Sequence, residues 1–338
     1  MKKMEIKNAV LRKDMLLDMK RPKIFILLLG INLLVFALLL FAVIPVVTSA
    51  FDGTTEALNP RFMIGFFSFL LWTIEIAVIF LVPALTAGAV SIEKERQTLE
   101  VLLTTRMTTW QIVSGKYFST VFLVVLLILS TLPALCSMFL YGGINILQML
   151  ILLCVLISTV VYIASFGIFF SALIKNTILS VILTYISVFA VLSLTFMFTV
   201  IGMAVMLILD EMLCNYIFET FGKSVSDVIS GDLFITILYF NPVVTLFDAI
   251  SQTFGYTFFD LADPMYGIKD MELFVHFTEK NLLLRWFPLF SVALQTLVSF
   301  LLLRAAAFFL KPVKKKAKKQ KVRGAKADGE RPSNITVY

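Results

Sequence analysis

Residues of the types that catalyse reactions or bind nucleotide are scarce in this sequence, and their spacing forms no recognisable catalytic site. The chain has a single histidine, His276, which excludes the usual histidine-based metal sites and catalytic triads within this chain. The tripeptide Gly-Lys-Ser at 222–224 resembles the end of a phosphate-binding loop, but Ile217 stands where that loop needs its first glycine. The sequence therefore predicts no catalytic residue, no metal ligand and no cofactor bound by this chain.

One acidic side chain lies inside an apolar run. Glu75 is near the middle of the apolar segment 62–88. An ionisable group at that depth costs about 3 kcal/mol to insert into the bilayer. Because of this cost such residues are rare within spans, and those that occur usually have a function. Glu75 could line a translocation path for a cationic or polar cargo, or it could be a protonated or hydrogen-bonded contact between helices. The sequence leaves both interpretations open.

The most strongly patterned polar segment is 91–116, which reads SIEKERQTLEVLLTTRMTTWQIVSGK. Ser91 is the predicted N-cap of a helix, and Glu93 and Glu95 lie near its first turn, where acidic groups suit the helix dipole. Apolar residues at helical spacing would give this helix an apolar stripe: Ile92, Leu99, Leu102 and Leu103.

The second half of this segment predicts a bend and a second helix. The run 104–109 is expected to break the first helix, and Thr108 and Gln111 have capping-box spacing for a helix that leads into the next apolar run. A cytoplasmic turn needs far fewer residues. The segment is therefore predicted to be a surface on which a partner docks and through which force reaches the membrane.

The composition identifies the class of protein that carries this segment. Hydrophobic residues make up 59% of the chain and charged residues 15%, with a mean hydropathy of +0.95, whereas soluble domains are about a quarter charged. We expect an all-α polytopic membrane protein with six transmembrane helices, at about 24–47, 62–88, 117–140, 146–174, 178–209 and 286–310.

The basic residues predict the orientation. Lysine and arginine are concentrated in 1–23, in the loop 89–116 and in the tail 311–338, which places both termini in the cytoplasm. The tail carries the excess behind the net charge of +7, and we expect it to be disordered and to contact anionic membrane lipids. That location argues against nucleic-acid binding.

The segment 210–285 is rich in acids and is predicted to lie outside the cell. Within it, the apolar stretch 233–247 is interrupted by Asn241 and Pro242 and is too short to cross the bilayer. We therefore expect short re-entrant or interfacial helices before the last span.

The string 93–116 resembles the signature of type 2 ABC exporter permeases, the ABC-2 family. The matching residues are Glu95, Thr98, Leu99, Glu100, Leu102, Leu103, Thr105, Ile112, Gly115 and Lys116. Gln97 stands in place of the usual glycine and Arg106 in place of the usual proline. These two departures concern the sharpness of the bends in the loop.

The resemblance implies that this chain is the membrane subunit and that other chains hydrolyse ATP. The loop 89–116 would contain the coupling helix that docks on a cytoplasmic ABC ATPase subunit, and 1–23 would form an amphipathic connecting helix. The partner ATPase would bind ATP and Mg²⁺, and a second permease, identical or homologous, would complete the transporter. The implied docking residues are Glu93, Lys94, Glu95, Arg96, Gln97, Thr98, Leu99, Glu100, Leu102 and Leu103.

The predicted function is that of a multi-pass permease subunit of an ABC exporter in the bacterial plasma membrane, with ATP hydrolysed by separate subunits. Two alternatives remain open. An ion-driven secondary transporter would need broken helices and several charges within the membrane, and this chain offers little besides Glu75. A membrane scaffold could also recruit a cytosolic partner through the same loop. The sequence does not identify the cargo.

Overall fold

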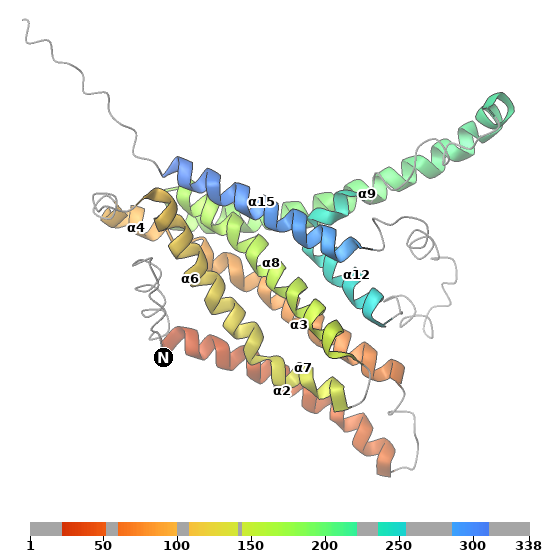
Figure 1. The fold of residues 1–338 in the computed structure, drawn as a ribbon, viewed down its shortest axis with the longest axis horizontal. Helices are drawn as coiled ribbons and strands as arrows, with labels where there is room; N and C mark the ends of the chain where they lie inside the picture. The colour runs from red at the N-terminus through yellow and green to blue at the C-terminus, as the bar shows by residue number, and fades with distance from the viewer. Residues whose placement is uncertain are drawn as a thin grey trace, which may run out of the picture.

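Long helices form from the apolar runs because a helix satisfies its own backbone hydrogen bonds where no water is present. The computed structural model describes residues 22–51, 60–99, 108–140, 144–221, 236–254 and 286–310, and these contain no strand. Its helices (Figure 1) are α2 (Pro22–Phe51), α3 (Pro60–Thr86), α4 (Ser91–Glu95), α6 (Thr109–Ser130), α7 (Leu132–Leu140), α8 (Ile146–Leu173), α9 (Thr177–Phe221), the 3-10 helix η2 (Ile237–Phe240), α12 (Pro242–Phe254) and α15 (Phe287–Phe309).

Helix α8 lies at the centre of the fold and packs against α3, α6, α9, α12 and α15. Small residues allow these close approaches, as they do between helices in membranes generally. Gly167 is the clearest case, because a Cβ atom there would lie 1.8 Å from Oγ1 of Thr86 and 3.3 Å from the backbone nitrogen of Ala87. Only glycine lets the end of α3 come this near to α8.

Five described helices are long and apolar enough to cross a membrane: Ile64–Glu95, Thr109–Cys136, Ile146–Leu173, Thr177–Gly202 and Phe287–Phe309. The all-α architecture is therefore confirmed, together with five candidate spans. The predicted first span falls within α2, of which Leu29–Phe41 forms a shorter apolar helix among the described residues. The sixth crossing stays a prediction.

The third predicted span, 117–140, has different bounds in the structure. Helix α6 begins eight residues earlier, at Thr109, because the capping box lies there. It ends at Ser130, and the separate helix α7 follows from Leu132. Pro133 explains the interruption, because proline lacks the N–H that would continue the backbone ladder of α6.

Helix α9 is also longer than the predicted span 178–209. It contains 45 residues and runs to Phe221, so the first part of the predicted outer segment is helical. At 1.5 Å per residue the helix is about 67 Å long, roughly twice the thickness of the hydrocarbon core. Figure 1 shows its end extending away from the other helices.

The predicted break at Asn241 is present, and polar contacts hold it. Helix η2 ends at Phe240 and α12 begins at Pro242. The side chain of Asn241 donates to Oγ1 of Thr195 (2.9 Å) and to the carbonyl of Leu192 (3.2 Å), and it accepts from the backbone N–H of Val243 (3.1 Å). The stretch 236–247 is therefore a broken helical pair, bonded to α9 at the break, with η2 packed against α9 and α12 against α8. Its depth in a membrane stays a prediction.

Other predictions lie outside the described residues. These are nearly all of the connecting helix at 1–23, the outer residues 222–235 and 255–285, and the basic tail at 311–338.

Candidate functional site

The segment that could receive a partner begins as a direct continuation of α3. Four residues in turn conformation, 87–90, join α3 to α4. Ser171 of α8 accepts hydrogen bonds from the backbone N–H groups of Val90 and Ser91, each at 2.8 Å. A side chain about 80 residues away thus caps the N-terminus of α4.

The predicted N-cap role of Ser91 is wrong. Val90 occupies the N-cap position, and Ser91 is the first residue of the helix. The hydroxyl of Ser91 is buried and donates to the carbonyl of Ala87 at 3.0 Å. The hydroxyl of Ser171 is the hydrogen-bond acceptor that a local N-cap side chain would otherwise provide. Sequence spacing cannot reveal a cap that comes from another helix.

Side chains also bond the turn before α4, and α4 itself, to α8 and α9. Ser180 donates to the carbonyl of Ala87 (2.9 Å), and Thr177 donates to the Glu95 carboxylate (2.6 Å). The Lys94 ammonium donates to the carbonyl of Ala172, near the end of α8. Helix α4 and the turn before it are therefore bonded to the end of α8 and the start of α9.

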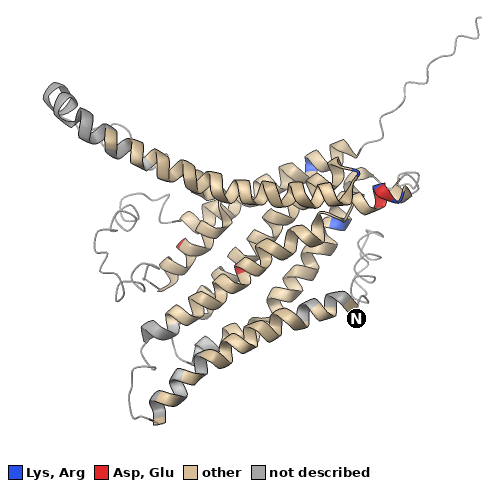
Figure 2. Cartoon of the chain, turned by 180° about the vertical axis from the view of Figure 1, so that it is seen from behind, with Lys and Arg blue, Asp and Glu red and all other residues tan. Residues whose placement is uncertain are grey.

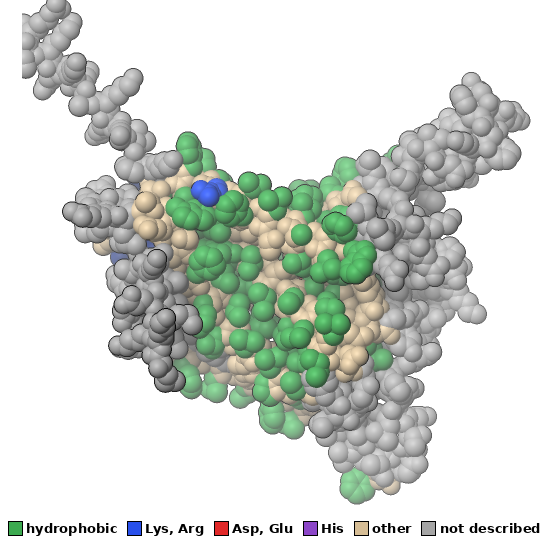
Figure 3. Space-filling view, viewed as in Figure 1, with side chains coloured by type: hydrophobic (Ala, Val, Ile, Leu, Met, Phe, Trp, Pro, Cys, Tyr) green, Lys and Arg blue, Asp and Glu red, His purple; other side chains and the backbone are tan. Residues whose placement is uncertain are grey.

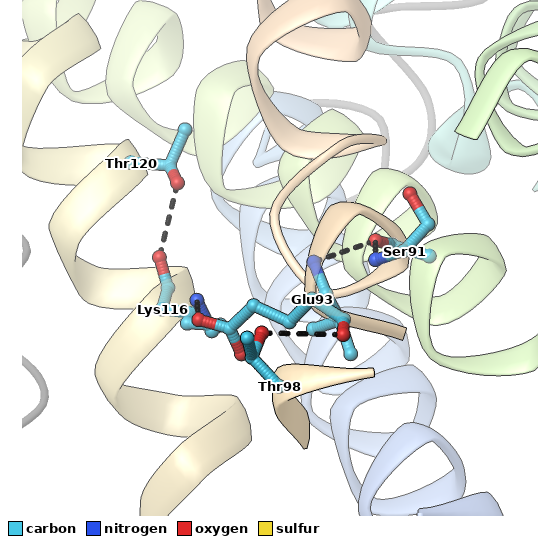
Figure 4. A network of polar contacts seen from close by, with 7 residues as sticks. Ser91, Glu93, Thr98, Lys116 and Thr120 are labelled. Carbon is cyan, nitrogen blue, oxygen red and sulfur yellow. Dashed lines mark hydrogen bonds and ion pairs between the residues drawn. The ribbon is translucent and has the colours of Figure 1, made fainter. Parts of the chain in front are cut away.

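An ion pair joins α4 to α6 as well. Oε1 of Glu93 lies 2.7 Å from Nζ of Lys116, whose side chain is only 8% exposed. Figure 4 shows the two side chains meeting between their helices, with Thr98 donating to the carbonyl of Glu93 at 3.3 Å. Loss of either charge would strongly destabilise the fold, because the remaining charge would be left unpaired where little solvent reaches it. Sequence matching had marked Lys116 as part of a signature but gave it no role.

Gln97 terminates the short helix. Its φ is +59°, and it is the one residue other than glycine with positive φ among the described parts of the chain. A left-handed residue just past a helix end is a common terminator, usually filled by glycine. The predicted longer helix is therefore wrong in its described part, because α4 has five residues and stops at Glu95. Gln97 occupies the position at which the ABC-2 signature usually has glycine.

The second predicted helix of the segment is confirmed. Thr108 accepts from the N–H of Gln111 at 3.3 Å, and the Gln111 side chain accepts from the N–H of Thr108 at 2.9 Å. Both halves of the capping box are thus made. Helix α6 begins at the next residue, Thr109.

The implied docking residues divide into three groups. Residues 95–98 are exposed and form the outer edge of the segment: Glu95, Arg96, Gln97 and Thr98. Glu93 and Lys94 are partly buried and make contacts inside the chain, and Leu99 is buried. Glu100, Leu102 and Leu103 lie outside the described residues. We call 95–98 the α4 edge.

Glu75 lies far from this edge, in the interface between α3 and α8. It is fully buried, and its Oε1 accepts from Oγ1 of Thr159 at 3.1 Å. Its Oε2 has no hydrogen-bond partner among the described residues. This geometry favours the interpretation of a contact between helices, and a role in a translocation path stays a prediction.

Charge is distributed unevenly over the described residues. Figure 2 shows acidic and basic side chains gathered near α4, whereas the long helices carry few. No group of histidine, cysteine, aspartate and glutamate among those residues could hold a metal ion. The arrangement suits a docking surface on one side of a membrane more than a reaction centre.

Comparison with known proteins gives one match. Residues 54–309 match the family described as ABC-2 family transporter protein. No curated protein and no solved structure matches the chain. The matched region contains every described helix except α2.

Proposed function

Because the chain belongs to the ABC-2 family of transporters, we propose that it is the membrane permease subunit of an ABC exporter. It moves its cargo outward while separate cytoplasmic subunits bind Mg²⁺ and hydrolyse ATP. Its location would be a bacterial plasma membrane. The α4 edge is the observation that carries this proposal, because it is exposed and polar and lies at the end of a short helix that is bonded to three others.

The bonds between α4 and its neighbouring helices indicate how a force applied to α4 would reach the membrane spans. Helix α4 is bonded to α6 through Glu93 and Lys116, to α8 through Ser171, and to α9 through Thr177. A push on the α4 edge would therefore move the cytoplasmic ends of these helices together. Motion of this kind is a hinge or shear transition between packed helices.

A second permease would complete the transport path. Many large apolar side chains of α9 are exposed, among them Ile182, Ile186 and Phe189. Phe189 packs edge to face on Phe80 of α3, but Ile182 and Ile186 stay about half exposed among the described residues. Either lipid or a second permease would cover this face. The second permease is identical or homologous to this chain in our proposal.

The substitution Arg96→Glu tests the docking edge. Arg96 is exposed, and its backbone N–H donates to the carbonyl of Ile92 at 3.0 Å, a bond that the substitution keeps. Charge reversal at a docking surface should reduce co-purification with the proposed ABC ATPase subunit and reduce ATP-dependent transport, because like charges across an interface cost several kcal/mol. Membrane insertion and yield should stay unchanged.

The matched control is Gln252→Lys. Gln252 is also exposed, but it lies on α12, at the opposite end of the molecule from α4. ATPase binding should persist in that variant. Full binding and transport by Arg96→Glu would contradict the docking edge. Export that survives inactivation of the ATPase but stops when ion gradients are collapsed would favour the ion-driven alternative.

A further inference from the structure

Arg304 is a charged residue on an otherwise apolar face of α15. Its side chain is exposed, and so are the neighbouring Phe300, Leu301 and Phe308. Figure 3 shows apolar side chains covering this face, with a small basic patch toward the end of α15. A guanidinium in such surroundings needs an anionic partner or water.

Two aromatic rings fix the position of this guanidinium. Its carbon lies 4.7 Å from the centre of the Trp110 ring and 5.0 Å from that of Phe300. The two rings meet edge to face, with centres 6.0 Å apart. Stacking uses the flat face of a guanidinium and leaves its N–H donors at the edge free. Within the described parts of the chain, Arg304 makes no hydrogen bond or ion pair.

The depth of Arg304 suits a lipid headgroup. It lies five residues before the end of α15 at Phe309, which corresponds to about 7.5 Å along the helix axis. Arginine at this depth extends toward the membrane surface, where tryptophan is also enriched. The exposed side chains of Phe300 and Leu301 offer apolar surface to an acyl chain.

We propose that Arg304 and Trp110 form a binding site, between α15 and α6, for an anionic phospholipid of the cytoplasmic leaflet. The N–H edge of Arg304 binds the phosphate, because guanidinium donors match phosphate oxygens in pairs. The Trp110 face that stacks on Arg304 cannot also hold a choline group, so the site disfavours phosphatidylcholine. The lipid would bridge the cytoplasmic ends of the two helices.

Fluorescence of Trp110 reports lipid bound beside that ring, so it separates lipid at the proposed site from lipid bound by the basic tail. With Trp72→Phe and Trp286→Phe in the full-length chain, Trp110 is the remaining tryptophan. The protein is reconstituted into phosphatidylcholine vesicles, and brominated phosphatidylglycerol or brominated phosphatidylcholine is titrated in. We expect phosphatidylglycerol to be preferred by about fivefold, the contribution of one basic residue at a membrane surface.

Three comparisons decide the outcome. Arg304→Gln should abolish the preference, and Arg304→Lys should retain part of it. Lys175→Gln, which removes an exposed cation from the turn between α8 and α9, should leave the preference unchanged. A preference that survives in Arg304→Gln, or is missing from the parent protein, would overturn the proposal. Relief of quenching by added inorganic phosphate would identify a free-anion site and would overturn it too.

A second measurement keeps the proposal testable if the tryptophan substitutions disturb assembly. Native mass spectrometry of the otherwise unchanged chain counts retained phosphatidylglycerol. Arg304→Gln should retain one lipid fewer than the parent, and Lys175→Gln should match the parent. Equal retention by all three proteins would contradict the site.

Discussion

At the scale of single residues, the bend after α4 depends on one unfavourable backbone conformation. Gln97 adopts φ of +59°, a region that costs a residue with a Cβ about 1–2 kcal/mol. Glycine avoids this cost but loses more conformational entropy on folding, by roughly 0.5–1 kcal/mol. The difference favours glycine by a small margin.

We therefore predict that Gln97→Gly raises the free energy of unfolding by up to about 1 kcal/mol. The measurement is thermal unfolding of the purified protein in detergent, together with amide exchange in 91–99. Thr98→Gly is the control, because Thr98 has helical conformation and donates to the carbonyl of Glu93. Glycine there should destabilise, by a few tenths of a kcal/mol through lower helix propensity and further through the lost hydrogen bond. Equal destabilisation by both substitutions would refute the strain at Gln97.

The same residue illustrates what local pattern can and cannot predict. The capping box of Thr108 and Gln111 was readable because both partners lie within one turn of helix. The end of α4 was not, because the apolar stripe from Ile92 to Leu99 also fits a longer helix. Only the resemblance to the ABC-2 signature marks position 97, through the glycine that usually stands there.

At the scale of elements, the helices were largely predictable and their junctions were not. Runs of about 20 apolar residues identify spans whatever their neighbours are. The contacts that seat α4 come from hydroxyls of Ser171 and Ser180, about 80 to 93 residues away in sequence. A buried serine looks the same in the sequence whether it bonds its own helix or another one.

Ser171→Ala tests whether α8 holds α4. The substitution leaves two buried N–H groups, those of Val90 and Ser91, without their acceptor, at a cost of about 1–3 kcal/mol for an unsatisfied group. We expect faster exchange of these two amides and weaker coupling of ATP hydrolysis to transport. Insertion should be normal.

Ser165→Ala is the matched control for this prediction. Ser165 is also fully buried on α8, but within the described parts of the chain its hydroxyl bonds the carbonyl of Tyr162 in its own helix, at 2.6 Å, and no other helix. Its loss should change little at α4. If Ser165→Ala loosened the two amides as much as Ser171→Ala does, general loosening of α8 would explain the effect.

At the scale of the whole molecule, the orientation of α4 and α12 is the property on which the proposed function depends. The two helices lie at opposite ends of the long helices in Figure 1. The α3 and α6 crossings flank α4, and its surroundings carry most of the described charge. The positive-inside rule predicts that this end lies in the cytoplasm, where an ATPase could reach it. The fold alone gives the axis of the molecule but not its direction across a membrane.

Single cysteines at Thr98 and Gln252 determine that direction. Both residues are exposed, and the three native cysteines, Cys136, Cys154 and Cys214, are first replaced by alanine. A membrane-impermeant maleimide added to intact cells should label Gln252→Cys and leave Thr98→Cys unreacted. Inverted vesicles should give the opposite pattern. Labelling of Thr98→Cys from outside would contradict the exporter proposal, because the α4 edge would then lie outside the cell and no cytoplasmic ATPase could bind it. The same result would also move Arg304 to the outer leaflet, so the lipid site and the docking edge share one test of orientation while keeping separate tests of binding.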